Sequence, residues 1–147
     1  MLRIDVTTVI SRPVQDVWDF FVDLTNSPRW TQSGSELRPT SKGPLGLGTT
    51  IVGVRTMLGR EIKSQTLVVT QFEPGRLIGI AADVKLLGHV PGAVTFENVA
   101  GRTRLSRWTE VDLGRAERLL GPLLARLLRS GQGTELANLK RLIEAGP

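Results

Sequence analysis

The middle of this chain is a run of short apolar segments whose connections are too brief for anything but antiparallel neighbours. Candidate strands occupy residues 35–40, 48–57, 61–73, 76–84, 92–99 and 102–113. The breaks between them hold turn formers, namely Lys42-Gly43-Pro44, Leu58-Gly59, Pro74-Gly75, Pro91-Gly92 and Ala100-Gly101. Because a parallel pair needs a crossover of roughly a dozen residues or more, the pattern predicts an antiparallel meander.

A further strand and two short helices are expected before the meander. Residues 2–10 alternate apolar and polar side chains, which predicts a strand with one buried face and brings the sheet to seven strands. Apolar side chains three and four positions apart then predict a helix. The two expected helices are residues 14–22, with Ser11 as N-cap and Pro13 in the first turn, and Leu24 to Trp30, capped by Thr25 or Asn26.

The last third of the chain predicts one long helix from roughly Arg115 to Ala145. Apolar side chains recur there at helical spacing, at Leu119, Leu120, Leu123, Leu124, Leu127, Leu128, Leu136, Leu139, Leu142 and Ile143. Gly121-Pro122 weakens the first turns, and Gly131 and Gly133 each cost roughly 1 kcal/mol relative to alanine. The leucine phase resumes in register at Leu136, so the helix is expected to continue past the glycines, which would also leave space beneath a cavity.

Composition excludes several classes of site. The chain has 147 residues, 40% of them hydrophobic, as expected for one soluble α+β domain spanning residues 1–147. It has no cysteine and one histidine, His89, which excludes a disulfide, a thiol nucleophile and a multi-histidine metal cluster. No metal or cofactor is therefore predicted. The sequence shows neither a signal peptide nor an apolar run of transmembrane length, so a cytoplasmic location without integral membrane association is expected.

The positive charge gathers toward the C-terminus. Of the net charge of +5, residues 102–147 hold +4, from nine basic and five acidic side chains. Five arginines fall on the polar side of the predicted helix, where a solvated face is expected: Arg115, Arg118, Arg126, Arg129 and Arg141. No exposed aromatic platform accompanies them, so nucleic acid is not expected as a partner. Attraction to anionic surfaces is the less favoured alternative.

The order of elements and several separated segments together resemble a known family. These segments are Pro13-Val14-Gln15-Asp16-Val17-Trp18-Asp19-Phe20-Phe21, Asp23-Leu24, Pro28-Arg29-Trp30, Glu73-Pro74-Gly75-Arg76-Leu77, Gly101-Arg102-Thr103-Arg104-Leu105 and Leu139-Lys140-Arg141-Leu142-Ile143-Glu144. Over nearly the whole chain they resemble the polyketide cyclase/dehydrase family of the START-like superfamily (SRPBCC, Bet v 1-like). The resemblance implies a helix-grip fold, in which a curved seven-stranded antiparallel sheet wraps around the C-terminal helix and encloses a cavity.

A curved sheet cannot close along the full length of one helix, so an apolar gap is expected between them. In the last strand the more apolar alternate set, which includes Leu105, Arg107 and Thr109, is expected to face the helix. The predicted ligand-binding residues are Trp30, Val94, Phe96, Leu105, Arg107, Thr109, Leu124 and Leu128. Arg107 is expected either to pair with an acidic side chain or reach solvent, or to anchor a carboxylate, phosphate or enolate.

Three classes of function remain open. The first is binding of a small hydrophobic or amphipathic ligand, such as a lipid, a fatty acid or a polyketide-like molecule. The second is a cyclase or dehydrase, for which His89 or Glu61 is the candidate base and Arg107 or Arg55 the electrostatic partner. The third is a protein-interaction or stress-related module with a vestigial cavity. Self-association into a homodimer is also left open.

Overall fold

The computed structural model describes residues 1–85 and 87–146. The strands are β1 (Leu2–Ile10), β2 (Glu36–Pro39), β3 (Thr50–Met57), β4 (Arg60–Glu73), β5 (Leu77–Val84), β6 (Gly88–Val99) and β7 (Arg102–Val111). The α-helices are α1 (Val14–Val22), α2 (Ser27–Trp30) and α3 (Glu117–Ala145), and the 3-10 helices are η1 (Leu24–Asn26), η2 (Gln32–Gly34) and η3 (Gly114–Ala116). The predicted helix-grip order of elements is confirmed.

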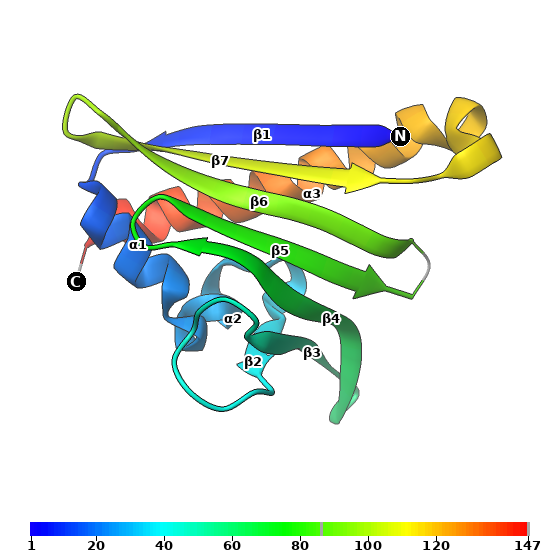
Figure 1. The fold of residues 1–147 in the computed structure, drawn as a ribbon, viewed down its shortest axis with the longest axis horizontal. Coiled ribbons are helices and arrows are strands. Elements are labelled where there is room, and N and C mark those ends of the chain that lie inside the picture. The colour runs from blue at the N-terminus through cyan, green and yellow to red at the C-terminus, as the bar shows by residue number, and fades with distance from the viewer. Residues whose placement is uncertain (86, 147) are drawn as a thin grey trace.

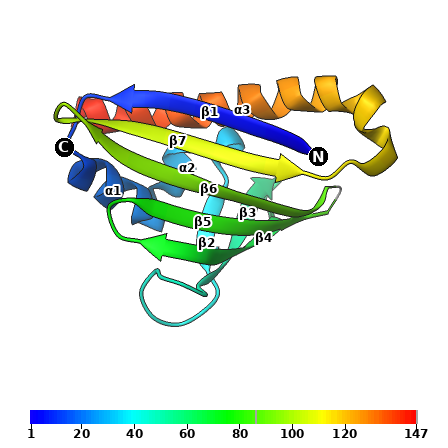
Figure 2. The same cartoon turned by 45° about the horizontal axis from the view of Figure 1, so that its top comes forward.

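The seven strands form one antiparallel sheet in the order β1-β7-β6-β5-β4-β3-β2. The chain therefore returns after the meander so that β1 pairs with β7, from Leu2↔Val111 to Ile10↔Thr103. The helix α3 runs along one face of the sheet, and α1 and α2 lie between its C-terminal part and the strands (Figures 1 and 2). Register shifts at Gly53/Val54 and between Val69 and Gln71 bend the β3–β4–β5 part of the sheet.

The predicted turn at Pro91-Gly92 is wrong. Strand β6 begins at Gly88, and Pro91 pairs with Ala81 inside the β5–β6 ladder. Proline is tolerated there because the pairing of β6 with β7 starts only at Gly92↔Thr109, so at Pro91 the ladder has one neighbour and one free side. The last strand also ends earlier than expected, at Val111.

Of the predicted helix caps, Ser11 and Thr25 are wrong, and Asn26 is confirmed by position alone. Helix α1 has Pro13 at its N-cap without a side-chain hydrogen bond, and the N–H of Ser11 instead donates to Glu144 at 2.8 Å. The expected helix from Leu24 to Trp30 divides into η1 and α2, and Asp23 caps η1 by accepting the N–H of Thr25 at 3.1 Å. Asn26, one of the two predicted alternatives, occupies the N-cap position of α2, but its side chain makes no capping hydrogen bond and instead donates its amide to the carbonyl of Phe20.

Helix α3 is continuous over 29 residues, as predicted, and contains Pro122. Pro122 has no N–H to bond the preceding turn, and Figure 2 shows the first turns at an angle to the remainder. The two mid-helix glycines differ in environment. A Cβ at Gly131 would lie 2.5 Å from the side-chain oxygen of Gln32, so this glycine admits η2 close to the helix. A Cβ at Gly133 would meet nothing within 4 Å.

The core has two parts, a larger aromatic one at one end of the molecule and a smaller one centred on Ala82, Val90 and Val111. Around the C-terminal half of α3, Leu136, Leu139 and Ile143 pack on an aromatic group in which Trp18 lies 5.0 Å from Phe96. The chain end is held there too, because Lys140 donates to both the Val9 carbonyl and Glu144 at 2.6 Å. Among the described residues, no helix is both long and apolar enough to cross a membrane.

The open space at Gly133 predicts that Gly133→Ala stabilises the protein. The change removes the entropic cost of glycine in mid-helix and creates no clash, so we expect the free energy of unfolding to rise by about 1 kcal/mol and Tm by about 2–4 °C. Urea and thermal unfolding followed by circular dichroism measure both. Gly131→Ala is the matched control and should gain less, since Gln32 must move. Equal gains at the two positions would contradict this account of the glycines.

Candidate ligand-binding cavity

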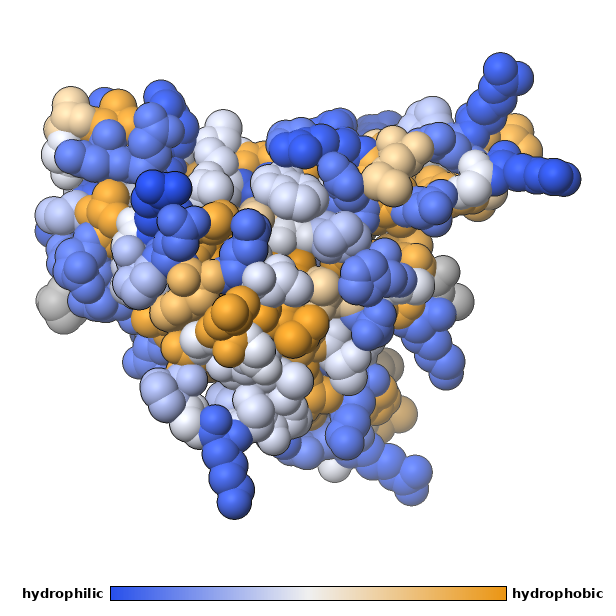
Figure 3. Space-filling view, in the orientation of Figure 1, coloured by the Kyte–Doolittle hydropathy of each residue, from blue (hydrophilic) through white to orange (hydrophobic). Residues whose placement is uncertain are grey.

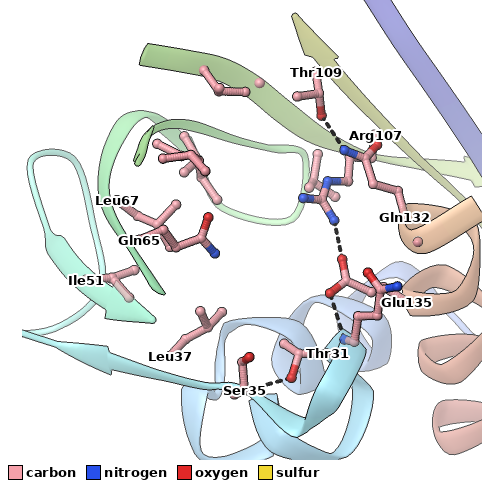
Figure 4. Close-up of a pocket in the computed structure, with 18 of the residues that line it drawn as sticks. Thr31, Ser35, Leu37, Ile51, Gln65, Leu67, Arg107, Thr109, Gln132 and Glu135 are labelled. Carbon is pink, nitrogen blue, oxygen red and sulfur yellow. Dashed lines mark hydrogen bonds and ion pairs between the residues drawn. The ribbon is translucent and has the colours of Figure 1, made fainter. Parts of the chain in front are cut away.

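A cavity of about 500 Å³ lies between the concave face of the sheet and α3. It begins where the aromatic core ends, and its lining comes from β2 to β7, the α1–η2 region and α3. Its walls differ in chemistry, as Figure 4 shows. The wall formed by β2 to β5 is mainly apolar, with Leu37, Ile51, Leu67, Val69, Ile78 and Ile80.

The opposite wall, formed by β7 and α3, carries connected polar groups. Arg107 Nη1 lies 2.7 Å from Glu135 Oε1, and the other oxygen of Glu135 accepts the backbone N–H of Gln32 at 2.9 Å. One turn earlier on α3, Gln132 Nε2 donates to Thr109 Oγ1 at 2.9 Å. These contacts join sheet, helix and η2 across the cavity wall (Figure 4). Because Glu135 is only 15% exposed, removing Arg107 would leave a carboxylate poorly solvated.

Two buried polar atoms in the cavity lining have no hydrogen-bond partner among the described residues. They are the indole Nε1 of Trp30 and the amide Oε1 of Gln132. The Trp30 ring stacks on Phe21 at 5.4 Å, and its backbone carbonyl accepts a hydrogen bond from Asn138. Buried polar atoms are usually paired. These two atoms are a donor and an acceptor without partners beside the cavity, and they add to the polar groups that Ser64 and Gln65 place on the facing wall.

The structure brings most of the sequence-predicted ligand residues to the cavity. Trp30, Val94, Arg107, Thr109 and Leu128 are in its lining. Two others lie outside the lining. Phe96 and Leu105 are 3% and 0% exposed and belong to the aromatic core around the C-terminal half of α3. Leu124 packs with Val111 and Leu128 in a second apolar cluster beside the lining. The alternation predicted for β7 agrees with its burial, because the set containing Leu105, Arg107 and Thr109 faces inward.

The candidate catalytic residues are not brought together. His89 belongs to strand β6 rather than a loop, is exposed, and lies with its Nδ1 3.4 Å from Asp83 outside the lining. Glu61 is also outside, where hydrogen bonds from Arg38 lower its pKa and weaken it as a base. Arg55 does line the cavity, as Arg107 does. Among the described residues, no group of three acidic, histidine or cysteine side chains has the arrangement of a metal site.

Sequence reasoning missed the helix side of the polar wall. Gln132 lies four residues after Leu128 and four before Leu136, so it interrupts the buried phase of the helix with an amide. Glu135 lies four residues before Leu139 on the same side. A polar residue in an otherwise apolar phase was the available signal. The backbone contact from Gln32 to Glu135 had no such signal, because it depends on how η2 approaches α3.

Comparison with known proteins supports one family and one fold. The model of the family described as polyketide cyclase/dehydrase and lipid transport matches residues 1–144. A search of curated protein sequences finds no match.

Three solved structures illustrate the likeness in fold. TTHA0849 from Thermus thermophilus has 16% identity and a TM-score of 0.73, with 97% of each chain covered. Ara h 8.0201 has 11% identity and a TM-score of 0.75, with 98% of each chain covered. CalU16 from Micromonospora echinospora has 16% identity and a TM-score of 0.71, over 99% of this chain and 76% of that one. At these identities the likeness establishes the Bet v 1-like fold alone.

The Arg107–Glu135 pair predicts an unequal cost of single and double changes. Arg107→Leu should lower the free energy of unfolding by about 2 kcal/mol, because it leaves Glu135 without its cation. Arg107→Leu with Glu135→Leu should recover much of that loss, since two apolar side chains replace two charges. Urea unfolding measures both. Arg104→Leu, at the exposed pair with Glu97, is the control and should cost less than about 1 kcal/mol. A double variant as unstable as Arg107→Leu would contradict the pairing.

Proposed function

Since this chain belongs to the polyketide cyclase/dehydrase and lipid transport family, we propose that it binds a small, uncharged amphipathic molecule in the cavity between sheet and helix. The apolar body of the ligand lies against β2 to β5. Its hydroxyl or carbonyl group faces β7 and α3, where Gln132 and Trp30 offer hydrogen bonds. A cavity of about 500 Å³ favours this function over an interaction module with a vestigial cavity.

The observation that carries the proposal is the neutral charge balance of the polar wall formed by β7 and α3. Arg107 is already matched by Glu135 at 2.7 Å. A carboxylate ligand that approached Arg107 would have to displace Glu135 and leave that side chain, 15% exposed, as an unpaired charge. A hydroxyl or carbonyl ligand needs no such displacement. This wall therefore selects against fatty acids whose carboxylate points toward β7 and α3, and favours neutral lipids or polyketide-like ketones and phenols there. Arg55, the other cation of the lining, is exposed on β3.

Glu135→Gln is expected to reverse this selection. For the wild-type protein, 1-decanol should displace the neutral dye Nile red at roughly tenfold lower concentration than decanoate. In Glu135→Gln the freed Arg107 attracts the carboxylate, so decanoate should bind roughly tenfold more tightly while decanol changes far less. Competitive fluorescence titration at neutral pH measures both affinities.

Two controls separate the cavity from the surface. Glu97→Gln removes an exposed carboxylate paired with Arg104 and should leave both affinities unchanged. Ala82→Phe places a ring at a buried lining position and should abolish dye uptake, with circular dichroism to confirm folding. Equal affinities for decanol and decanoate in the wild-type protein would contradict the selection. No uptake of Nile red by folded wild-type protein would contradict ligand binding itself.

Cyclase or dehydrase chemistry is the second candidate, favoured by the family description. Within the described lining, Glu135 is the one carboxylate, so it is the candidate acceptor for a proton next to a ketone, and Arg107 the candidate partner for the enolate oxygen. Both carboxylate oxygens of Glu135 are already engaged, one by Arg107 at 2.7 Å and the other by the N–H of Gln32 at 2.9 Å, so neither is free to approach a substrate proton.

We therefore expect the protein not to accelerate proton exchange at a ketone. The probe is 4-phenyl-2-butanone in heavy water, with α-proton loss followed by NMR in the presence and absence of protein. The expected rate equals that in buffer. Acceleration that is lost in Glu135→Gln and kept in His89→Ala would overturn this expectation and establish the enzyme instead.

A further inference from the structure

The first half of α3 exposes a band of leucines. Leu119, Leu120, Leu123 and Leu127 are 87%, 51%, 59% and 61% exposed. They continue the apolar stripe that is buried further along the helix, but no part of the described sheet covers them. Isolated exposed leucines are ordinary, whereas four on adjoining turns of one helix make a contiguous apolar surface.

Arginines flank this band. At about 3.6 residues per turn, Arg118, Arg126 and Arg129 fall on the helix flank next to the leucines, and Arg115 lies in η3 just before them. None of these four arginines makes an ion pair with a described residue. Glu117, which adjoins Arg118 in the sequence, is paired with the N-terminal ammonium group at 2.9 Å. Figure 3 shows the result as apolar surface between long hydrophilic side chains where α3 begins.

The β3–β4 hairpin repeats this combination on the other side of the cavity. Met57, Leu58 and Ile62 are 49%, 101% and 46% exposed, and Arg60 and Lys63 lie beside them in the chain. In Figure 1 the tip of this hairpin lies at the bottom of the view, whereas α3 begins at the upper right. Both elements reach the cavity, because Arg55 and Leu127 contribute to its lining.

We propose that the leucine–arginine surface of Leu119, Leu120, Leu123, Leu127, Arg115, Arg118, Arg126 and Arg129 docks on an anionic lipid bilayer. An amphipathic helix binds a bilayer interface by burying its apolar side chains at the acyl boundary while its cations meet lipid phosphates. The unpaired arginines give this face the charge complementary to such a surface. In a second copy of the chain, the same face would present like charges to itself. Docking brings Leu127, at the edge of the cavity, to the lipid.

Vesicle binding tests the docking directly. The protein should co-float with vesicles of phosphatidylcholine and phosphatidylglycerol, bind pure phosphatidylcholine vesicles far less, and lose binding in high salt. Arg118→Gln with Arg126→Gln should weaken binding roughly thirtyfold. Leu119→Ser with Leu123→Ser should weaken it by at least about tenfold. Arg76→Gln with Arg102→Gln, in the β4–β5 turn and at the first residue of β7, makes the same change of net charge at the opposite end of the sheet and should leave binding nearly unchanged.

The absence of cysteine allows a site-specific measurement of insertion. A single Leu123→Cys carries an environment-sensitive fluorophore, whose emission should shift to the blue with anionic vesicles. The same fluorophore at Leu47→Cys, which is 74% exposed in the β2–β3 loop, should not shift.

Several results would overturn the docking surface. They are no binding to anionic vesicles, binding that the leucine pair does not affect, or equal shifts at positions 123 and 47. A leucine-dependent dimer in sedimentation velocity without vesicles would also overturn it and assign the surface to a second copy. Nile red uptake in vesicle-free solution reports on the cavity separately, so failure of the docking and failure of ligand binding are distinguishable.

Discussion

The ion pair between Arg107 and Glu135 joins the sheet to the long helix at the point where the aromatic core ends and the cavity begins. Toward the C-terminus, Leu136, Leu139 and Ile143 are buried against aromatic rings, and the interior is filled. Toward the N-terminus the helix and sheet separate around the cavity. At the boundary, Glu135 also accepts the N–H of Gln32, so one carboxylate holds β7, α3 and η2 together. The cavity therefore has a polar wall on the helix side, and that wall is already neutral.

The sheet was predictable because its signals are local. Alternation in β1 and β7 and the turn formers at Leu58-Gly59, Pro74-Gly75 and Ala100-Gly101 need no knowledge of tertiary structure. Pro91-Gly92 was wrongly predicted to be a turn. Proline can lie within a strand where one side of that strand has no partner, and the local sequence does not show whether a partner is present. The predicted cap at Ser11 failed for a similar reason: α1 begins after Pro13, and the N–H of Ser11 is bound by Glu144, a residue at the far end of the chain.

The candidate site was predictable only on its strand side. The inward direction of Arg107 and Thr109 follows from the period of two in β7, whatever else packs nearby. Their partners depend on the rotation and axial position of α3, which no local pattern determines. Gln132 carried a readable signal, a polar side chain in a buried helical phase. The hydrogen bond from Gln132 to Thr109 and the ion pair of Glu135 with Arg107 depend on how α3 packs on the sheet. Only the three-dimensional structure shows them.

The exposed leucines follow from a mismatch in length. Helix α3 has 29 residues and so spans about 44 Å, whereas the ten residues of β7 span about 33 Å. A helix whose C-terminal end is tied to the β1–α1 junction by Lys140 and Glu144 must therefore extend past the other end of the strands by about two turns. Periodicity alone marks the whole leucine stripe as a buried face, because it reports phase and not the length of what lies beneath. The first turns have the pattern of a core helix and no sheet to cover it, so their leucines are left exposed at the surface that we propose as the docking face.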